Sequence, residues 1–398
     1  MDKLLYQYIL TIVSLGLFLY EYFPLQQNPP QEVISPATHL NGIKLNSSEI
    51  YKAQVDRIVV IVIDALRMDF VTNENLPFVT STFPKNGCML EVHVQSPTVT
   101  LPRIKALTTG QVPQFLDIVL NLASTEVLKD SVLHSAKQAG KRIIFYGDDT
   151  WIKLFPNIFD RKEGVSSFFV DDYTEVDNNV TRNVKKELNN NDWDLMFLHY
   201  LGLDHIGHVY GPFNHLVPVK LLEMDSIIKV IYDKLHDKKT LILVTGDHGM
   251  KDSGGHGGTT VEETFVPLIV LGNKCKNDSI VQTDVAATLA ALLGLTLPRG
   301  NTGRINLNMF GSLSHEEELY ILNYGASSLK SQINDYEVIY EEAKDTYYKF
   351  LQTRDIAIAE NAKLLYQRYL QRASKSLIQT YLNQSDEVLL LSKPKHEY

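Results

Sequence analysis

RIVVIVID, at residues 57–64, is the stretch that decides the fold. A continuous run of β-branched residues suits a strand buried on both faces of a parallel sheet. Similar runs recur at residues 142–146, 195–201, 240–245 and 266–271, and stretches of helical character separate them. Strands that alternate with helices predict an α/β fold, with a mostly parallel central sheet flanked by helices.

Three aspartates stand after three of these runs, namely Asp64, Asp204 and Asp247. A lone aspartate after a strand is more often a helix N-cap. In open α/β sheets, however, ligands bind beyond the carboxyl ends of the strands. The shared position of the three aspartates therefore predicts a single site at this edge of the sheet.

Histidines accompany two of the aspartates. His208 lies four residues after Asp204, His248 follows Asp247 directly, and His256 lies in a glycine-rich loop at residues 254–258. Carboxylate oxygens and imidazole nitrogens together favour Zn²⁺ over Mn²⁺. The number of ligands predicts two divalent metal ions. We assign one ion to Asp204, His208 and His256, and the other to Asp64, Asp247 and His248. The histidines expected not to be ligands are His93, His199, His205 and His215, with His205 as a neighbour of the ligands.

The segment Ser96-Pro-Thr98-Val-Thr100-Leu-Pro102-Arg103 precedes a short helical stretch that ends at Gly110. A threonine at a helix start is usually only a cap. Beside two metal ions its hydroxyl pKa would fall, and the helix amino end would favour a phosphate anion. We therefore predict Thr100 as a nucleophile, with Arg103 contacting a phosphate oxygen or the substrate headgroup.

The amino-terminal segment is almost wholly apolar from residue 4 to residue 20. This length is close to the roughly 20 residues that cross a bilayer, and aromatic residues suited to a membrane interface follow it. We predict an uncleaved signal-anchor transmembrane helix over residues 1–24, in preference to a cleaved signal peptide or a buried soluble helix. Lys3 before the span places the remainder in the lumen. N-x-S/T sequons agree with this orientation, at Asn46, Asn179, Asn277 and Asn383.

The rest of the chain divides by composition. A linker is predicted at residues 25–53, a catalytic domain at 54–312 and a helical stalk at 313–398, opened by a capping-box pattern at Ser314. The two cysteines, Cys88 and Cys275, cannot form a disulfide framework, and two free buried thiols are favoured over a single bridge. The net charge is −9 and there is no basic stripe, which argues against a nucleic-acid partner.

Several stretches together resemble the alkaline-phosphatase superfamily, and more closely the GPI ethanolamine phosphate transferases of the endoplasmic reticulum. They are VIDALRMDF, PTVTLPRIKALTTG, FYGDDTWIKLFP, SFFVDDYTEVDNNVTRN, HYLGLDHIGH, TGDHGM and QTDVAATLAALLGL. The resemblance runs from about residue 54 to residue 310 and places the family's nucleophile on Thr100. It places the metal ligands on the residues chosen above, Asp64, Asp204, His208, Asp247, His248 and His256.

The resemblance implies transfer of phosphoethanolamine from phosphatidylethanolamine to a mannose of a GPI-anchor precursor, with the second mannose favoured, through a covalent intermediate on Thr100. It also implies an endoplasmic-reticulum membrane location with the catalytic domain in the lumen, and a small membrane protein as partner subunit. The family continues into a multi-pass membrane region, whereas this sequence ends at Tyr398. We therefore expect a fragment or truncated product that lacks the membrane half.

Two alternatives remain open. A nucleotide pyrophosphatase/phosphodiesterase-like ectoenzyme shares the ligand pattern and a similar nucleophile segment. A non-catalytic truncated form is the second, although the presence of every site residue argues against it. A sulfatase is not favoured, because its nucleophile derives from cysteine or serine with an arginine four residues on. Here the residue is Thr100, and Arg103 comes three residues on.

Overall fold

The computed structural model describes residues 3–22, 34–113, 128–236 and 239–390. Its centre is an eight-stranded sheet with the order β10-β4-β9-β8-β3-β7-β5-β6. The strands are β3 (Arg57–Ile63), β4 (Gly87–His93), β5 (Ile143–Asp148), β6 (Arg161–Val165), β7 (Leu195–Tyr200), β8 (Thr240–Thr245), β9 (Phe265–Leu271) and β10 (Asp278–Val281). Only β9 runs antiparallel to its neighbours β4 and β8, and the other pairs in this sheet are parallel.

The predicted α/β fold with a mostly parallel sheet is therefore confirmed. Every predicted apolar run forms a strand, and β3, β5, β7, β8 and β9 are almost wholly buried. The sequence interpretation missed β4, β6 and β10. Two of these, β6 and β10, are edge strands with exposed polar residues, so they carry no continuous apolar pattern.

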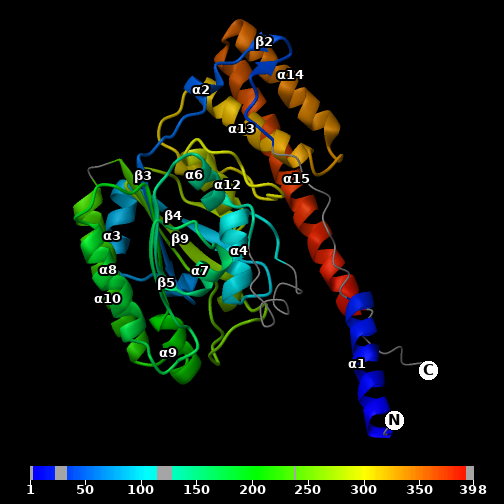
Figure 1. Ribbon diagram of the computed structural model, residues 1–398. Coiled ribbons are helices and arrows are strands. Elements are labelled where there is room, and N and C mark those ends of the chain that lie inside the picture. The colour runs from blue at the N-terminus through cyan, green and yellow to red at the C-terminus, as the bar shows by residue number, and fades with distance from the viewer. Residues whose placement is uncertain (1–2, 23–33, 114–127, 237–238, 391–398) are drawn as a thin grey trace.

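Helices cover both faces of the sheet (Figure 1). One face packs against α4, α6, α7 and α12, and the other against α3, α8, α9 and α10. Their bounds are α3 (Pro77–Asn86), α4 (Thr100–Thr109), α6 (Val132–Gln138), α7 (Thr150–Leu154), α8 (Glu175–Glu187), α9 (Gly202–Tyr210), α10 (Leu216–Leu235), α11 (Val261–Thr264) and α12 (Asp284–Leu292). The two apolar layers fix the sheet between them and leave its ends free for a site.

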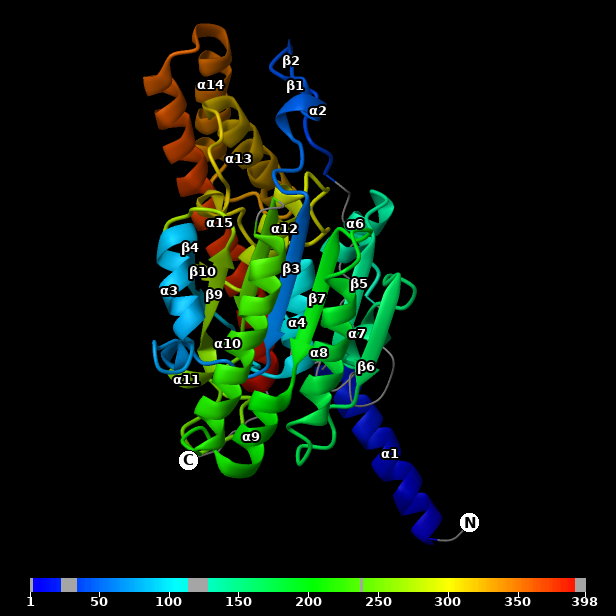
Figure 2. The same ribbon diagram turned by 90° about the vertical axis from the view of Figure 1, so that its left-hand side faces the viewer.

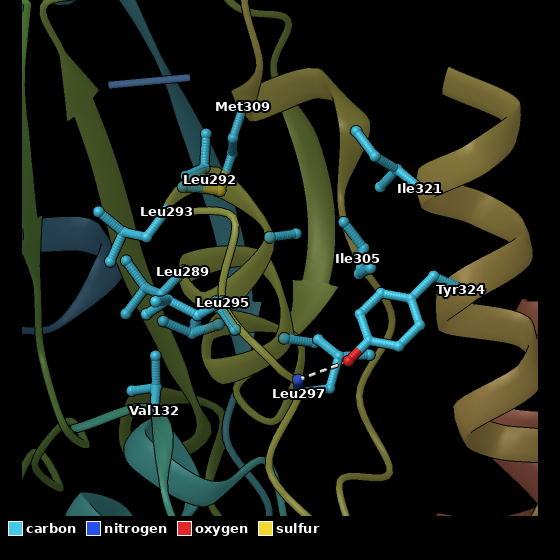
Figure 3. Close-up of a cluster of buried hydrophobic side chains, with 14 of the residues drawn as sticks. Val132, Leu289, Leu292, Leu293, Leu295, Leu297, Ile305, Met309, Ile321 and Tyr324 are labelled. Atoms are coloured by element: carbon cyan, nitrogen blue, oxygen red, sulfur yellow. Dashed lines mark hydrogen bonds between the residues drawn. The ribbon is translucent and has the colours of Figure 1, made fainter. Parts of the chain in front are cut away.

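A helical unit follows the sheet domain and consists of α13 (His315–Lys330), α14 (Glu337–Thr353) and α15 (Ile356–Leu390). The capping box predicted at its start is present: Ser314 Oγ accepts from the Glu317 amide, and Glu317 accepts from the Ser314 amide. The unit packs on the α12 side of the core, where Ile321 and Tyr324 of α13 meet Ile305 (Figure 3). Its helices α13 and α14 lie at the end of the sheet opposite to α9 (Figure 2).

The described part of the predicted linker is folded against this unit. It forms a small hairpin of β1 (His39–Leu40) and β2 (Ile43–Lys44), followed by α2 (Ser47–Ile50). Tyr51 donates its hydroxyl hydrogen bond to the carbonyl of Leu295 at 2.7 Å. Residues 25–33 of the predicted linker lie outside the described residues.

The predicted amino-terminal anchor forms α1 (Lys3–Tyr22). None of the helices in the described ranges combines the length and apolarity needed to cross a membrane.

The interpretation of Cys88 and Cys275 as free thiols is wrong, because the two form a disulfide with Cα atoms 5.2 Å apart. The cysteines are 187 residues apart in the sequence. Cys88 lies in β4, which pairs with both β9 and β10, and Cys275 lies in the connection between those two strands. The sheet order brings them together, and sequence spacing gave no sign of it.

The contact between the helical unit and the core can be tested at Tyr324. Its hydroxyl accepts from the amide of Leu297 at 3.0 Å and donates to the carbonyl of Ile34 at 2.9 Å. Tyr324→Phe should lower the free energy of unfolding by about 1–3 kcal/mol in urea denaturation, because a buried amide loses its acceptor. Tyr369→Phe is the control, since no hydrogen-bond partner is found for its buried hydroxyl among the described residues. Equal losses in both variants would contradict this account.

Candidate metal centre and active site

Three adjacent parallel strands bring the predicted aspartates together. Because β3 lies between β7 and β8 in register, the strand ends before Asp64, Asp204 and Asp247 meet at one edge. The amide of Asp64 donates to the carbonyl of Tyr200 at 2.9 Å, which extends the β3–β7 pairing to the site itself. The ends of the three strands that precede the predicted ligands therefore meet at one edge of the sheet.

Helix α9 carries Asp204 and His208 one turn apart, so both point from the same helical face. His208 Nε2 lies 3.3 Å from Asp204 Oδ2. The start of α9 is held by Asp177, whose Oδ1 accepts from the amides of Leu201 and Gly202 at 2.9 and 3.0 Å. Asp177 is fully buried and was not singled out from the sequence, although it lies inside the stretch SFFVDDYTEVDNNVTRN that carried the resemblance.

The glycine-rich loop with His256 is fixed by hydrogen bonds to the segment before α4. His256 Nδ1 lies 2.7 Å from the carbonyl of Thr98. The Thr98 hydroxyl accepts from the amide of Gly257 at 2.9 Å and donates to the carbonyl of Gly258 at 3.0 Å. These contacts place the segment with the predicted nucleophile beside His256, and Thr100, two residues after Thr98, opens α4. Thr98 therefore holds the loop, a role that sequence reasoning missed.

The predicted ligands form two adjoining clusters. In the first, His208 Nε2 and His256 Nε2 are 3.0 Å apart, and His256 Nε2 lies 3.7 Å from Asp204 Oδ1. In the second, His248 Nε2 lies 3.5 Å from Asp64 Oδ1 and 3.4 Å from Asp247 Oδ2. The rings of His248 and His256 stack with centroids 4.0 Å apart and so join the clusters.

In two of the histidines, the contact that Nδ1 makes shows that Nε2 is the nitrogen free to bind a metal. His248 Nδ1 lies 2.9 Å from the carbonyl of Gly249, and His256 Nδ1 contacts the carbonyl of Thr98. A carbonyl oxygen only accepts, so each Nδ1 must carry the hydrogen and each Nε2 keeps its lone pair. This pattern, in which the second ring N–H is bound by a carbonyl, is usual for metal-ligating histidines.

Unsatisfied buried atoms also point to a cation. Asp64 Oδ1, Asp247 Oδ2 and His248 Nε2 are buried, and no hydrogen-bond partner is found for them among the described residues. The three atoms face one another at the distances given above, and a divalent ion between them would satisfy all three. The residues of both clusters therefore fit divalent metal ions. By distance alone His199 could also join Asp64 and Asp247.

The electrostatics agree with a cation site. Burial, followed by repulsion from Asp247 and Asp204, raises the pKa of Asp64 well above its ordinary value. Burial alone would raise the pKa of Asp204, but the hydrogen bond with His208 and the nearby histidines lower it. Burial and repulsion from His248 lower the pKa of His256 to about 4. Carboxylates crowded in this way are what a bound divalent ion relieves.

The remaining predicted residues lie around these clusters. Arg103 is fully buried and donates to Gln282 Oε1 at 3.3 Å, while Gln282 Nε2 donates to the carbonyl of Asp247 at 2.6 Å. Its contact with substrate stays a prediction. His205, itself in α9, has Nδ1 2.7 Å from the carbonyl of Asp172 and so connects this helix to the segment before α8. His215 is exposed, and His93 ends β4.

Metal content can be tested on the first cluster. His256→Ala should lower the metal bound per chain to about half of the parent value, because the buried second cluster keeps its own ligands. Elemental analysis of the purified protein measures the content. His215→Ala is the matched control, since its ring lies on the surface and should change nothing. Unchanged metal content in His256→Ala would remove His256 from the ligand set.

Comparisons with known proteins identify the family of the chain. Residues 58–266, more than half of the 398, match a family described as type I phosphodiesterase / nucleotide pyrophosphatase. A Homo sapiens protein named GPI ethanolamine phosphate transferase 2, catalytic subunit, is 42% identical over 320 residues, which cover 76% of this chain and 33% of that protein. GPI ethanolamine phosphate transferase 2 of Schizosaccharomyces pombe is 44% identical over 289 residues, covering 64% of this chain and 38% of that protein. The predicted resemblance is thereby confirmed.

The chain spans between 33% and 43% of the length of the curated relatives it matches. Among solved structures, the wild-type alkaline phosphatase PafA aligns with a TM-score of 0.51 at 12% identity, covering 65% of this chain and 99% of that chain. Such a similarity concerns the fold alone, which is alkaline-phosphatase-like as predicted. Thr100 and the six predicted ligands all lie within the matched residues 58–266. The chain belongs to the type I phosphodiesterase / nucleotide pyrophosphatase family.

Proposed function

We propose that this chain is the catalytic part of a transferase that moves phosphoethanolamine from phosphatidylethanolamine to a mannose hydroxyl of a GPI-anchor precursor. The relatives at about 40% identity are named for this activity on GPI. The observation that carries the proposal for this chain is the convergence of carboxylates and histidines beside the Thr100 segment. The second mannose is the favoured acceptor, by the same likeness.

The reaction needs two displacements at phosphorus. Thr100 Oγ1 attacks the donor phosphate, its proton leaves, a P–O bond to threonine forms, and the bond to the diacylglycerol oxygen breaks with protonation of that oxygen. The mannose oxygen then attacks the phosphorus of the phosphoethanolamine–threonine, a P–O bond to mannose forms, the bond to Thr100 Oγ1 breaks, and the proton of the mannose hydroxyl ends on Thr100 Oγ1. Thr100 begins α4, so the free backbone amides of the first turn would favour a phosphate bound next to Thr100. We also propose that Arg103 contacts a phosphate oxygen or the headgroup of the substrate.

We propose two divalent ions at this site, with zinc favoured by the mixed nitrogen and oxygen donors. One would be held by Asp204, His208 and His256, and the other by Asp64, Asp247 and His248. When bound, such ions lower the pKa of an attacking hydroxyl and stabilise the charge of a transferring phosphoryl group. The first cluster is the more open, because His208 keeps about a third of its side chain exposed, 35%, whereas His248 is fully buried.

A lipid donor fits the surface next to the site. Large apolar side chains are exposed at Phe168, Phe169, Tyr210 and Phe213. Tyr210 ends α9 two residues after His208, and its ring lies 6.2 Å from that of Tyr173, which joins the segment after Phe169 to α9. Exposed apolar side chains gathered in this way mark interaction sites. They favour a lipid over a nucleotide as the donor.

We further propose an endoplasmic-reticulum membrane location, with residues 1–24 as anchor, residues 54–312 as the lumenal catalytic domain and a small membrane protein as partner. The disulfide between Cys88 and Cys275 supports an oxidising compartment. Three of the four sequon asparagines, Asn46, Asn277 and Asn383, are exposed. The proposed linker and stalk keep the bounds 25–53 and 313–398.

The nucleophile can be tested with Thr100→Ala. This variant should lose at least about a thousandfold in transfer of labelled phosphoethanolamine. Its metal content and unfolding midpoint should stay at the parent values, because Thr100 is not a ligand. Thr100→Ser should keep part of the activity, since it keeps a hydroxyl. Activity of the alanine variant near that of the parent would exclude the proposed intermediate.

Assays on the purified parent chain distinguish the proposed transferase from the two alternatives. A nucleotide pyrophosphatase/phosphodiesterase would release nucleoside monophosphate from a dinucleotide and would leave phosphatidylethanolamine intact. A non-catalytic form would turn over neither substrate while still binding metal.

Topology can be tested by glycosylation in cells. A lumenal catalytic domain should gain endoglycosidase-sensitive mass, and replacing the exposed Asn46 and Asn277 by Gln should remove part of it. Asn179 should contribute less, because its side chain is half-buried and donates to Glu163. A chain with no mass shift on endoglycosidase treatment would contradict the lumenal orientation.

A further inference from the structure

His199 is a buried histidine of β7 that touches the metal cluster without belonging to the predicted ligands. Trp151 Nε1 lies 2.9 Å from His199 Nδ1, and both side chains are almost fully buried. His199 Nε2 lies 3.3 Å from Asp64 Oδ2, and no hydrogen-bond partner is found for this nitrogen in the described part of the chain. The three side chains thus form a row from the core to the cluster.

The direction of the hydrogen bond between Trp151 and His199 decides which ring nitrogen of His199 carries the hydrogen. An indole N–H only donates, so His199 Nδ1 must accept and keep its lone pair towards Trp151. The neutral imidazole then carries its hydrogen on Nε2, the nitrogen that faces Asp64. His248 and His256 have the opposite arrangement, because their Nδ1 atoms face carbonyl oxygens.

The surrounding packing holds this row in place. The Trp151 ring stacks on Phe145 at 5.4 Å and lies 5.5 Å from Phe197. On β5, Gly147 allows the strands to approach closely, since a Cβ there would lie 2.3 Å from the carbonyl oxygen and 2.8 Å from the Cβ of His199. Neither ring can turn without disturbing the core.

We propose that His199 is a positioning residue that directs its Nε2–H towards Asp64 Oδ2 and is not itself a metal ligand. This contact leaves Asp64 Oδ1, which has no partner among the described residues, directed towards the cluster. Trp151 sets this role by fixing the tautomer of His199. The inference rests on the metal centre of the proposed function but not on its substrate.

A spectroscopic experiment separates a ligand from a positioning residue. The full chain, with its histidine rings labelled with heavy nitrogen, is loaded with an NMR-active cadmium isotope. Ring nitrogens of His208, His248 and His256 should couple to cadmium, whereas His199 should show a neutral ring with hydrogen on Nε2 and no coupling. The His199 signal is assigned by its loss in His199→Gln. Coupling between cadmium and His199 would overturn the proposal.

Zinc affinity tests the role of the indole. Trp151→Phe keeps an aromatic ring but removes the donor, and it should weaken binding at one zinc site by about ten- to a hundredfold, the usual effect of losing such an outer partner. Competition with a chromophoric chelator measures the affinity. Trp193→Phe is the matched control, because it removes an indole N–H that donates to the carbonyl of Glu187. Equal affinity in the two variants would contradict a role for Trp151.

Replacing the histidine itself completes the test. His199→Leu should weaken zinc binding as Trp151→Phe does, and His199→Gln, which can still donate to Asp64, should bind more tightly than the leucine variant. If His199→Leu binds zinc like the parent chain, the positioning role is excluded. These measurements use metal alone, so a failure of phosphoethanolamine transfer would leave their outcome unchanged.

Discussion

The parallel pairing of β3 with β7 and β8 is the constraint on which the site depends. The three strands lie in register, with Ile63 opposite Tyr200 and Val62 opposite Thr245. A shift of one residue in any of them would turn its side chains to the other face of the sheet. Because both faces of the sheet are covered by apolar layers, such a shift would draw a polar residue at a strand end, such as Asp64, into that packing. The core therefore fixes the aspartates at the strand ends, and the chemistry depends on packing far from it.

That arrangement has an electrostatic cost. Asp64, Asp204 and Asp247 are all buried, and Asp204 is the most exposed of the three, at 8%. Buried carboxylates without partners are strongly unfavourable, and two close together oppose each other's ionisation. The raised pKa of Asp64 reflects this repulsion. A bound divalent ion relieves the repulsion between these carboxylates. The crowding that destabilises the chain without metal therefore favours metal binding.

Much of this could be predicted from the sequence, for identifiable reasons. Residues 57–64 carry an unbroken apolar run, so the buried strand and its terminal Asp64 were evident. The clustering of the three aspartates and their accompanying histidines could be predicted because these residues lie close in the chain to the ends of the strands. The edge strand β6 was missed because its residues are polar and exposed, as edge positions allow. The disulfide was missed because Cys88 and Cys275 meet only through the order of strands in the sheet.

The protonation pattern of the buried histidines could not be predicted from the sequence. His199 and His248 are the same residue type, both fully buried and both within 3.5 Å of Asp64. What distinguishes them is the group on the far nitrogen: an indole donor for His199 and a carbonyl acceptor for His248. Trp151 is 48 residues from His199 in the chain, so spacing says nothing of their contact. The ring nitrogen that keeps a lone pair thus depends less on the residue type than on the partner of the other nitrogen, and the fold supplies that partner.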